Sequence, residues 1–363
     1  MDLVPDRERD LMIALSLLPF LSPSRTRLLV EYFDPLDRVT GASPEAIAAL
    51  LRVDLAAARQ VRNPLGSPAQ LAAVAELRGD VVTLRDPEYP PLLREIADPP
   101  LTLHLAGDRS LLATHSIAVV GSRRATPYAL NAAQKLAQEL VRAGVTVVSG
   151  LARGVDAAAH QSALEASGRT IAVIGTGIDM VYPRSHRQLS RQIQEQGLIV
   201  SEFPAGTPPL APNFPIRNRV ISGLTLGTVV VEATGRSGSL ITARMAAEQG
   251  REVFAVPGSI FSTGSEGVHR LIQSGAKLVH DIDDIFEELP QLRTAPAGKN
   301  PRTPLEPELQ RLLDLIRCDE PLHVDLAATT LGVPVNALAE PLLTLEVRGL
   351  ITSLPGARYL KRA

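Results

Sequence analysis

The 363-residue sequence contains one cysteine, no tryptophan and only 3% aromatic residues. A single cysteine, Cys318, allows neither an intramolecular disulfide nor a metal site built from several cysteines of one chain. No apolar run reaches the roughly 18 residues that span a bilayer, and the acidic start MDLVPDRERD is unlike the basic start of a signal peptide. We therefore expect a cytoplasmic protein that is neither secreted nor inserted in a membrane.

The sequence also lacks an excess of charge of either sign, since its formal net charge is -2. A protein with this balance has no overall basic surface, so any site for nucleic acid must be a local patch. With 45% apolar and 21% charged residues the composition is that of a globular protein, and the length suffices for two or three domains. Disordered and fibrous classes are disfavoured.

Clusters of proline, glycine and serine divide the sequence into five predicted parts. Residues 1–80 carry apolar residues at helical spacing and are expected to form a small helical domain. Residues 81–113 are rich in proline and mix short strands with turns, which indicates a connector packed on a larger neighbour. A central domain, 114–289, is followed by a proline-rich linker at 290–305. Residues 306–363 show three helices and a strand pair, the order of a winged helix-turn-helix.

The central domain repeats a unit made of a β-branched run, a glycine-containing turn and a helical segment. Apolar runs about 25 to 30 residues apart are typical of parallel strands that helices cover on both faces. We therefore predict a doubly wound, mostly parallel α/β sheet. Its expected strands are IAVV (117–120), VTVV (145–148), IAVI (171–174), LIV (198–200), TVVV (228–231) and EVFAV (252–256).

Small and polar residues follow these runs, at the edge of the sheet where ligands bind in open α/β folds. The turns GSRRAT (121–126), SGLARGVDAAAH (149–160) and EATGRSGSLITA (232–243) combine glycines with helix starts, whose amide groups favour anions. Arg123 and Arg153 could add bidentate contacts to a phosphate. The glycines could also serve only to make tight turns, and neither GxGxxG nor GxxxxGK[ST] occurs at the right place. Several such turns on one edge favour an anion-binding site.

Carboxylates also follow the strands, at Asp156, Glu202 and Glu232, and could suggest metal-dependent hydrolysis. They lie after three different strands without a DxD or ExK cluster, and carboxylates beside helix starts commonly cap amides or hold arginines. His160 is expected to orient or pack rather than to bind a metal. The sequence shows neither a serine–histidine–aspartate order nor a cysteine nucleophile. We predict a protein that is not an enzyme, with no cofactor and no metal site.

GSRRAT, SGLARGVDAAAH, SEFPAG, NFPIRNRVISGL and SGSLITARMAAEQGREVFAVPG stand in the order and spacing of the bacterial DprA/Smf family of DNA-processing proteins. The resemblance covers about 170 residues of the central domain and extends weakly to both end domains. It implies an extended Rossmann-like domain that binds single-stranded DNA without sequence specificity, forms a homodimer and helps to load a RecA-type recombinase. It also implies protection of incoming single strands during natural transformation.

The resemblance further implies which residues contact DNA, with Arg123 similar to the main phosphate contact of the family. The implied DNA-binding residues are Gly121, Ser122, Arg123, Arg124, Thr126, Gly150, Arg153, Gly154, Asn213, Phe214, Arg217, Asn218, Arg219, Ser237, Gly238 and Ser239. The dimer surface of the family lies near Leu271 and Ile272, which are therefore implied as interface residues. Ordinary burial on one side of a helix is the alternative explanation for these two residues.

The stretch NFPIRNRVISGL (213–224) by itself could be a solvated turn ahead of a helix or part of an anion site. By resemblance, Arg217 and Arg219 line or buttress the phosphate-binding edge and Asn218 fixes the loop. Arg219 could instead pair with Glu232. We expect an exposed Arg217 that contacts phosphate and an inward-pointing Arg219 that holds a carboxylate, because apolar residues follow Arg219 directly.

The two end domains are expected to contribute little to DNA binding. The N-terminal helices resemble a sterile-alpha-motif-like or helix-hairpin-helix module but lack the paired glycines whose amides hold a phosphate. The third helix of the C-terminal domain carries Glu340 and Glu346 against one arginine, Arg348. That charge balance suits contact with a protein better than contact with the major groove of DNA.

One alternative function comes from a different class. LOG-type phosphoribohydrolases process nucleotides, have a related fold and share a PGGxGTxxE motif that supplies a catalytic glutamate. The corresponding turn here, TGRSGSLITA, has no acid after it. The sequence therefore favours a DNA-binding protein over a nucleotide-processing enzyme.

Overall fold

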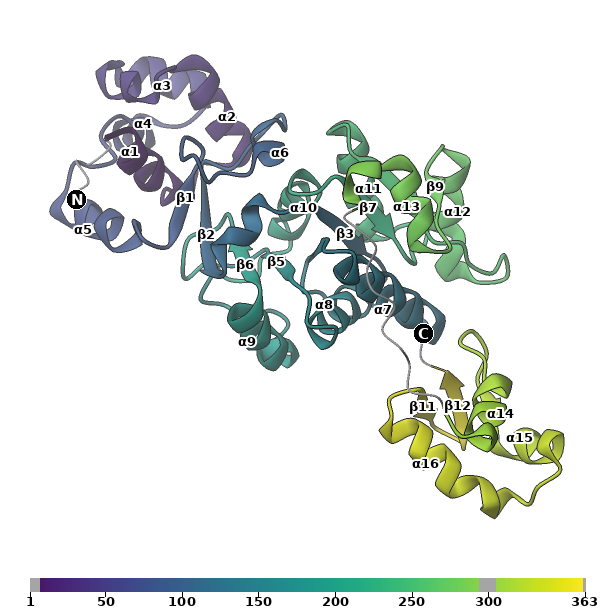
Figure 1. The fold of residues 1–363 in the computed structure, drawn as a ribbon. Helices are drawn as coiled ribbons and strands as arrows, with labels where there is room; N and C mark the ends of the chain where they lie inside the picture. The colour runs from purple at the N-terminus through teal and green to yellow at the C-terminus, as the bar shows by residue number, and fades with distance from the viewer. Residues whose placement is uncertain (1–6, 294–304, 362–363) are drawn as a thin grey trace.

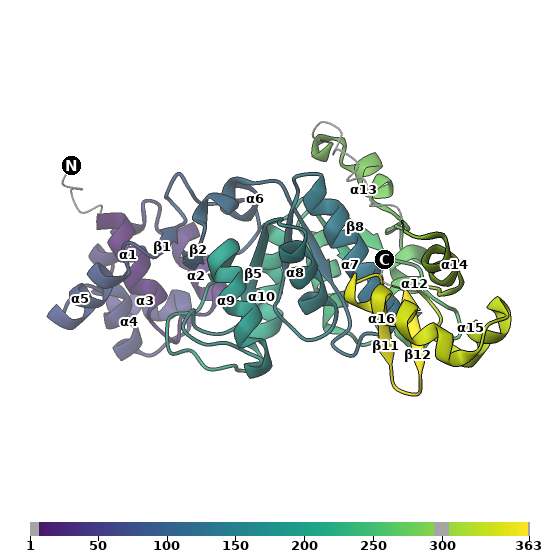
Figure 2. The same ribbon diagram turned by 60° about the horizontal axis from the view of Figure 1, so that its bottom comes forward.

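The computed structural model describes residues 7–293 and 305–361. Helices at the N-terminus lie at one end of a central sheet, and the C-terminal domain lies at the other end, beside helix α7 (Pro127–Arg142) (Figures 1 and 2). Most of the predicted linker, 290–305, falls outside the described residues. Its first residues form a short 3-10 helix, η5 (Pro290–Leu292).

The N-terminal region is helical, as its apolar spacing predicts. Ser43, Asp54 and Ser67 precede three of the helices and accept hydrogen bonds from backbone amides of the first turn, which satisfies donors that a helix start leaves free. The elements are α1 (Arg7–Ser16), α2 (Pro23–Tyr32), η1 (Leu36–Gly41), α3 (Pro44–Leu51), α4 (Leu55–Arg62) and α5 (Pro68–Leu77).

Nine strands form the central sheet, in the order β1-β2-β6-β5-β4-β3-β7-β8-β9. The strands from β3 to β9 are parallel, and β1 and β2 are antiparallel additions at the β6 edge. The strands are β1 (Val81–Thr83), β2 (Thr102–Gly107), β3 (Ser116–Val120), β4 (Thr146–Ser149), β5 (Thr170–Ile174), β6 (Leu198–Ser201), β7 (Gly227–Val230), β8 (Glu252–Ala255) and β9 (Lys277–Leu278).

All six strands expected from the apolar runs are present, and every residue of β3 to β7 is buried, as continuous apolar strands between two helical layers require. The proline-rich segment 81–113 does more than pack on the central domain. It supplies β1 and β2 to the sheet, with α6 (Pro91–Arg94) between them and η2 (Arg109–Ala113) after them.

Helices cover both faces of the sheet (Figures 1 and 2). One face is covered by α7, α8 (Val155–Glu165), α9 (Arg187–Gln196), which follows the short η3 (Arg184–His186), and α13 (Ile282–Glu288). The other face is covered by α10 (Asn213–Gly223), α11 (Gly238–Glu248) and α12 (Glu266–Gln273), which follows η4 (Thr263–Ser265). The hydrophobic cluster under this second face continues without a break into the N-terminal helices.

The C-terminal domain has the predicted helix order and one more strand than expected. Its three-stranded sheet has the order β10-β12-β11 and packs on a separate hydrophobic cluster. The elements are α14 (Pro307–Leu315), β10 (Leu322–His323), α15 (Val324–Leu331), η6 (Val335–Leu338), α16 (Ala339–Val347), β11 (Ile351–Leu354) and β12 (Arg358–Lys361).

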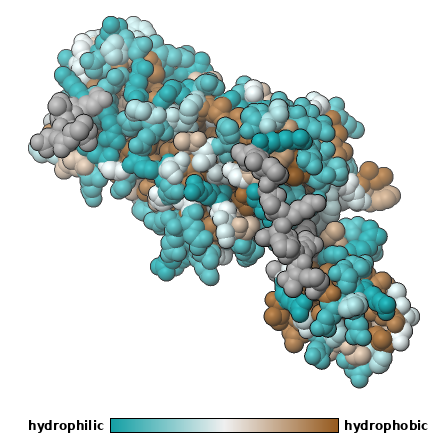
Figure 3. Space-filling model, in the orientation of Figure 1, coloured by the Kyte–Doolittle hydropathy of each residue, from teal (hydrophilic) through white to brown (hydrophobic). Residues whose placement is uncertain are grey.

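The described surface is mainly hydrophilic, with brown patches at the right-hand rim of the central part and on the C-terminal domain (Figure 3). The loop after β8 exposes Ile260 and Phe261, and α16 exposes Leu343 and Val347 beside Glu340. Within residues 7–293 and 305–361, no single helix is long and apolar enough to cross a membrane. The bent pair Val324–Leu331 and Val335–Val347 meets that test only when its two parts are joined across an angle of 102°.

Candidate functional site

A groove of about 760 Å³ opens where the strand order of the sheet reverses. Successive strands are added on one side of β3 as far as β6, and β7 then pairs with the other side of β3. The chain segments after β3 and β7 therefore lead in opposite directions and leave a crevice at the carboxyl ends of the strands. The loop after β3, one side of α10 and the first turn of α11 line this groove.

Most of the predicted DNA-binding residues line the groove. They come from three segments that are far apart in the sequence and that the fold brings together. These residues are Gly121, Ser122, Arg123, Arg124, Phe214, Arg217, Asn218, Ser237, Gly238 and Ser239.

A smaller hollow of about 370 Å³ adjoins the groove and shares Arg123 and Phe214 with it. Gly150 and Arg153, also predicted from the sequence, line this hollow together with Arg184. Arg184 was not predicted as a site residue from the sequence. Its signal was the turn GTGIDMVYP after β5, because Arg184 follows that turn directly.

Free positive charge gathers at these two hollows. Arg123, Arg124, Arg153 and Arg184 are exposed. Among the described residues, none of the four has a carboxylate within ion-pair distance. Guanidinium groups that are exposed and without an internal partner are free to bind phosphate oxygens in pairs.

Helix starts add neutral donors to the same edge. Ser237 caps α11, and its hydroxyl accepts the amide N–H of Ser239 at 3.4 Å. The helix N-terminus and its first amides therefore face a groove that already carries arginines. Asn218 ties α10 to this turn, because its amide nitrogen donates to the carbonyl of Gly238 at 3.4 Å.

Two aromatic rings stand between the groove and the smaller hollow. The rings of Tyr182 and Phe214 have centroids 5.4 Å apart and are inclined by 41°. The guanidinium carbon of Arg123 lies 5.7 Å from the centroid of Phe214. An arginine at this distance from an aromatic face is held by a cation–π interaction, so Arg123 has a defined position although it is exposed. Tyr182, like Arg184, was missed in the sequence.

The stretch NFPIRNRVISGL forms helix α10, not a loop, and Arg217 is buried with 4% of its surface exposed. The expectation of an exposed Arg217 was therefore wrong. The Arg217 guanidinium donates to the backbone carbonyls of Gly150, at 2.8 Å, and Val173. Burial lowers the pKa of Arg217 to about 10, and the nearby carboxylate of Asp156 opposes this effect. Arg217 thus joins α10 to the ends of β4 and β5 beneath the groove.

Asp156 holds the loop after β4 in place. Its carboxylate accepts the amide N–H groups of Gly150, at 3.1 Å, and Ala152, at 3.3 Å. Burial raises the pKa of Asp156, against the effects of Arg217 and of the two amides. Gly154 closes the same loop with φ +77°, and a Cβ there would lie 2.2 Å from the carbonyl oxygen of Ser122. Only glycine fits this position without strain.

Arg219 points inward as expected, but its partner is not Glu232. Arg219 has 4% of its surface exposed, forms an ion pair with Glu202 and places its Nε 3.2 Å from the carboxylate of Asp98. Glu232 instead accepts the hydroxyl of Thr126 at 2.6 Å. Arg219 therefore fastens α10 to the segment between β1 and β2, and both it and Thr126 lie outside the lining of the groove.

Two further residues singled out in the sequence are buried and do not line the groove. Asn213 is buried at the start of α10, and His160 is buried in α8 with its Nδ1 2.7 Å from the hydroxyl of Thr170. Burial lowers the pKa of His160 to about 3, with smaller effects from Arg217 and His186. A neutral imidazole packed between α8 and β5 agrees with the expectation that His160 packs rather than binds a metal.

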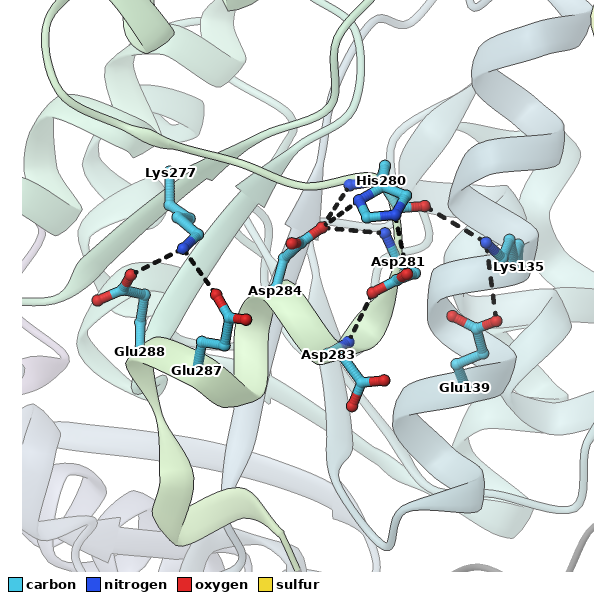
Figure 4. A network of polar contacts seen from close by, with 9 residues as sticks. All are labelled: Lys135, Glu139, Lys277, His280, Asp281, Asp283, Asp284, Glu287 and Glu288. Carbon is cyan, nitrogen blue, oxygen red and sulfur yellow. Dashed lines mark hydrogen bonds and ion pairs between the residues drawn. The ribbon is translucent and has the colours of Figure 1, made fainter.

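One cluster among the described residues combines residue types that bind metals: His280, Asp281 and Asp284, whose ligand atoms lie within 4.8 Å of one another. Their contacts, shown in Figure 4, are those of a helix start. Asp281 caps α13 and accepts the amide of Asp283, while Asp284 accepts the amide of Asp281 and the Nδ1 of His280 at 2.7 Å. A capping box accounts for this cluster without a ligand.

Leu271 and Ile272, the predicted dimer residues, lie in α12 and are half-buried. Both pack against the hydrophobic cluster under the α10 and α11 face. This position agrees with ordinary burial and leaves part of each side chain accessible, so their role in a dimer stays a prediction.

Comparisons with known proteins place this site in a family. The family model described as DNA recombination-mediator protein A matches residues 80–290, and the one described as DprA winged helix domain matches residues 295–357. Protein Smf from Escherichia coli (strain K12) is 44% identical over 283 residues, which cover 76% of this chain and 76% of Smf.

Solved structures agree with these matches. The X-ray structure of DNA processing protein A from Streptococcus pneumoniae aligns with a TM-score of 0.67 and 37% identity, over 77% of this chain and 95% of that one. DNA processing protein A from Helicobacter pylori, in a structure described by its single-stranded DNA binding mode, aligns with a TM-score of 0.54 and 31% identity, over 59% of this chain and 97% of that one. The chain belongs to the DprA/Smf family of DNA recombination-mediator proteins, with a DprA-type winged helix domain after its central sheet.

Proposed function

We propose that this protein binds single-stranded DNA without sequence specificity, protects incoming single strands during natural transformation and loads a RecA-type recombinase on them. Membership of the family and the single-stranded DNA binding named for the Helicobacter pylori relative support the proposal. We also propose that the protein acts in the cytoplasm as a homodimer.

The observation that carries the proposal is the groove at the β3–β7 crevice. Exposed arginines and the start of α11 offer charged and neutral donors to phosphates. Tyr182 and Phe214 offer aromatic surface between the two hollows, where an unpaired base could stack. Phosphate contacts and stacking are the two elements of recognition that tolerate any base sequence.

The donors of the groove also predict how binding depends on conditions. Guanidinium groups that neutralise phosphates release bound counterions, so the affinity should fall steeply as salt is added. Duplex DNA keeps its bases paired and stacked inward, where the Tyr182 and Phe214 rings cannot reach a base face. We therefore expect a preference for single strands over duplex.

The alternative of a nucleotide-processing enzyme has little support at this site. Asp156, Glu202 and Glu232 are each held by internal donors, and they lie after different strands. The turn at the start of α11, TGRSGSLITA, has no acid after it, whereas the LOG-type motif ends in a glutamate. Release of nucleobase from nucleoside monophosphates, followed by chromatography, would revive this alternative.

Replacement of Arg123 tests the proposal directly. Arg123→Glu reverses a charge on an exposed loop that lines both hollows, so binding of oligo-dT should weaken at least tenfold, which corresponds to about 1.4 kcal/mol. Stability should stay within about 0.5 kcal/mol, because the side chain is exposed. Fluorescence anisotropy at several salt concentrations measures the affinity, and urea midpoints measure the stability.

Arg311→Glu is the matched control, since Arg311 is exposed on α14 in the C-terminal domain and undergoes the same charge change. It should bind oligo-dT like the unaltered protein. The proposal fails if the unaltered protein does not bind oligo-dT at low salt, and Arg123 leaves the site if its charge reversal has no effect. Light scattering with and without oligo-dT tests the dimer.

A further inference from the structure

Two arginines of helix α9, Arg187 and Arg191, line neither hollow of the site and continue a row that begins with Arg184. Arg184, in η3, and Arg187 and Arg191, in α9, are exposed. Spacings of three and four residues place them on one side of the helix. The opposite side faces the protein, where Ser190 and Ile193 are buried.

The positive charges of this row are not neutralised by neighbouring acids. Among the described residues, none of the three guanidiniums has a carboxylate within ion-pair distance. Some exposed arginines elsewhere on the surface do have such partners, as Arg27 has in Glu31 and Arg85 has in Asp34. Three adjacent cations without an acid partner repel one another and therefore favour a bound polyanion.

The row begins inside the site itself. Arg184 lines the smaller hollow together with Arg123 and Arg153. Because α9 follows β5, its first turn lies at the carboxyl edge of the sheet, and the helix then leads away from that edge beside β6 and β2 (Figures 1 and 2). The arginines thus form a continuous path that starts in the hollow and leaves it.

An acidic residue lies at the far end of this row of arginines. Glu195 is exposed one helical turn beyond Arg191, on the same side of α9. A carboxylate there would repel the next phosphate. Arg187 and Arg191 are one turn apart, about 6 Å along the axis, so the path suits a few backbone phosphates.

We propose that Arg187 and Arg191 form a second backbone-binding segment, along which a single strand leaves the groove past Tyr182 and Arg184. The ligand class is a run of phosphodiesters, without contacts to base edges. This inference rests on the proposed function and adds a direction of exit and a longer occluded length. Short oligonucleotides that fill only the groove do not reach this segment, whereas longer oligonucleotides do.

The test compares oligo-dT of about 6 and about 20 nucleotides, lengths that bracket common single-strand site sizes. Arg187→Glu/Arg191→Glu should bind the short oligonucleotide as the unaltered protein does. Its affinity for the long one should fall at least tenfold, and the slope of log affinity against log salt should drop by about 1.4, which is two phosphates at about 0.7 each.

Arg38→Glu/Arg59→Glu is the control, because both residues are exposed in the N-terminal helices and the net charge change is the same. Equal weakening by this control would overturn the inference, since the effect would then be one of overall charge. Unchanged binding of the long oligonucleotide by Arg187→Glu/Arg191→Glu, or equal weakening for both lengths, would overturn it as well. Failure of the proposed function is a separate outcome, because the unaltered protein would then bind neither length at low salt.

Discussion

Arginines in one short stretch can have quite different roles, and the NFPIRNR sequence shows it. Arg217 and Arg219 are two positions apart on α10, so they point to nearly opposite sides of the helix, yet both are buried. Arg217 reaches carbonyls at the ends of β4 and β5, and Arg219 reaches Glu202 and Asp98. The sequence could not reveal these partners, because all of them come from distant segments.

Arg217→Ala should destabilise the protein by about 3 to 5 kcal/mol. The substitution removes the donor to two buried carbonyls and leaves the Asp156 carboxylate without its nearby cation. Urea unfolding measures the change, with Arg153→Ala as the control, since Arg153 is exposed and its loss should cost no more than about 0.5 kcal/mol. An Arg217→Ala protein as stable as the Arg153→Ala protein would contradict the buried role.

The exposed part of the site was easier to predict from the sequence. Glycine-rich turns after apolar runs point to one sheet edge whatever the details of packing, so Arg123 and Arg153 could be placed there in advance. Tyr182 and Arg184 were missed, because neither residue type marks a site and the only signal was their position in or directly after the turn GTGIDMVYP that follows β5. In the folded chain, Phe214 of α10 contacts the ring of Tyr182 and lines the smaller hollow together with Arg184.

At the scale of elements, strands were predicted well and α10 was not. A strand that is buried on both faces has a continuous run of apolar residues, and such a run can be recognised from the sequence alone. Helix α10 is buried on two sides by polar contacts, so its sequence has neither an apolar stripe nor a solvated face. The segment that holds the short strands β1 and β2 could be predicted to contain strands, but the pairing of β2 with β6 depends on a register between distant segments.

Helix α10 also packs closely against the segment that holds α6. A Cβ on Gly223 would lie 2.7 Å from Leu93 and 3.1 Å from Ile96, both of which are buried. Gly223→Ala should therefore destabilise the protein by about 1 to 3 kcal/mol, as overpacking does in a close-packed core. Thermal or urea unfolding measures this change.

Gly79→Ala is the matched control, because a Cβ there meets no atom within 4 Å. It should be nearly neutral. Equal stability of the two variants would show that α6 moves away from α10 at little cost, and the contact between them would then be loose.

For the whole molecule, the hydrophobic cores decide which parts are coupled. The cluster under α10 and α11 continues into the N-terminal helices, which include buried Met12 and Leu29. The C-terminal domain has a hydrophobic cluster of its own. The proposed division at residue 80 thus crosses a shared core, whereas the C-terminal domain has its own core and contacts α7 through polar groups.

Asn131 on α7 makes that contact. Its amide nitrogen donates to the carbonyls of Cys318, at 2.9 Å, and Lys361, at 3.1 Å. Asn131→Ala should remove about 1 to 3 kcal/mol of docking free energy, at about 0.5 to 1.5 kcal/mol for each hydrogen bond. Small-angle scattering should then give a larger radius of gyration, while oligo-dT binding at the distant groove stays unchanged.

Gln134→Ala, one turn along the same helix, is the control and should leave the radius of gyration as it is. A radius that does not change in Asn131→Ala either would mean that other contacts hold the C-terminal domain in place. A loss of oligo-dT binding in Asn131→Ala would mean that the docked domain takes part in binding.

Both acceptors of Asn131 belong to the main chain. A main-chain carbonyl is the same whatever side chain its residue carries, so the two positions on the C-terminal domain can change residue type while the attachment persists. Among residues 7–293 and 305–361, the hydrogen bonds that join the C-terminal domain to α7 come from this one side-chain amide. The C-terminal domain is in this sense an exchangeable part: another domain whose backbone followed the same course could be grafted in its place and would dock on the same asparagine.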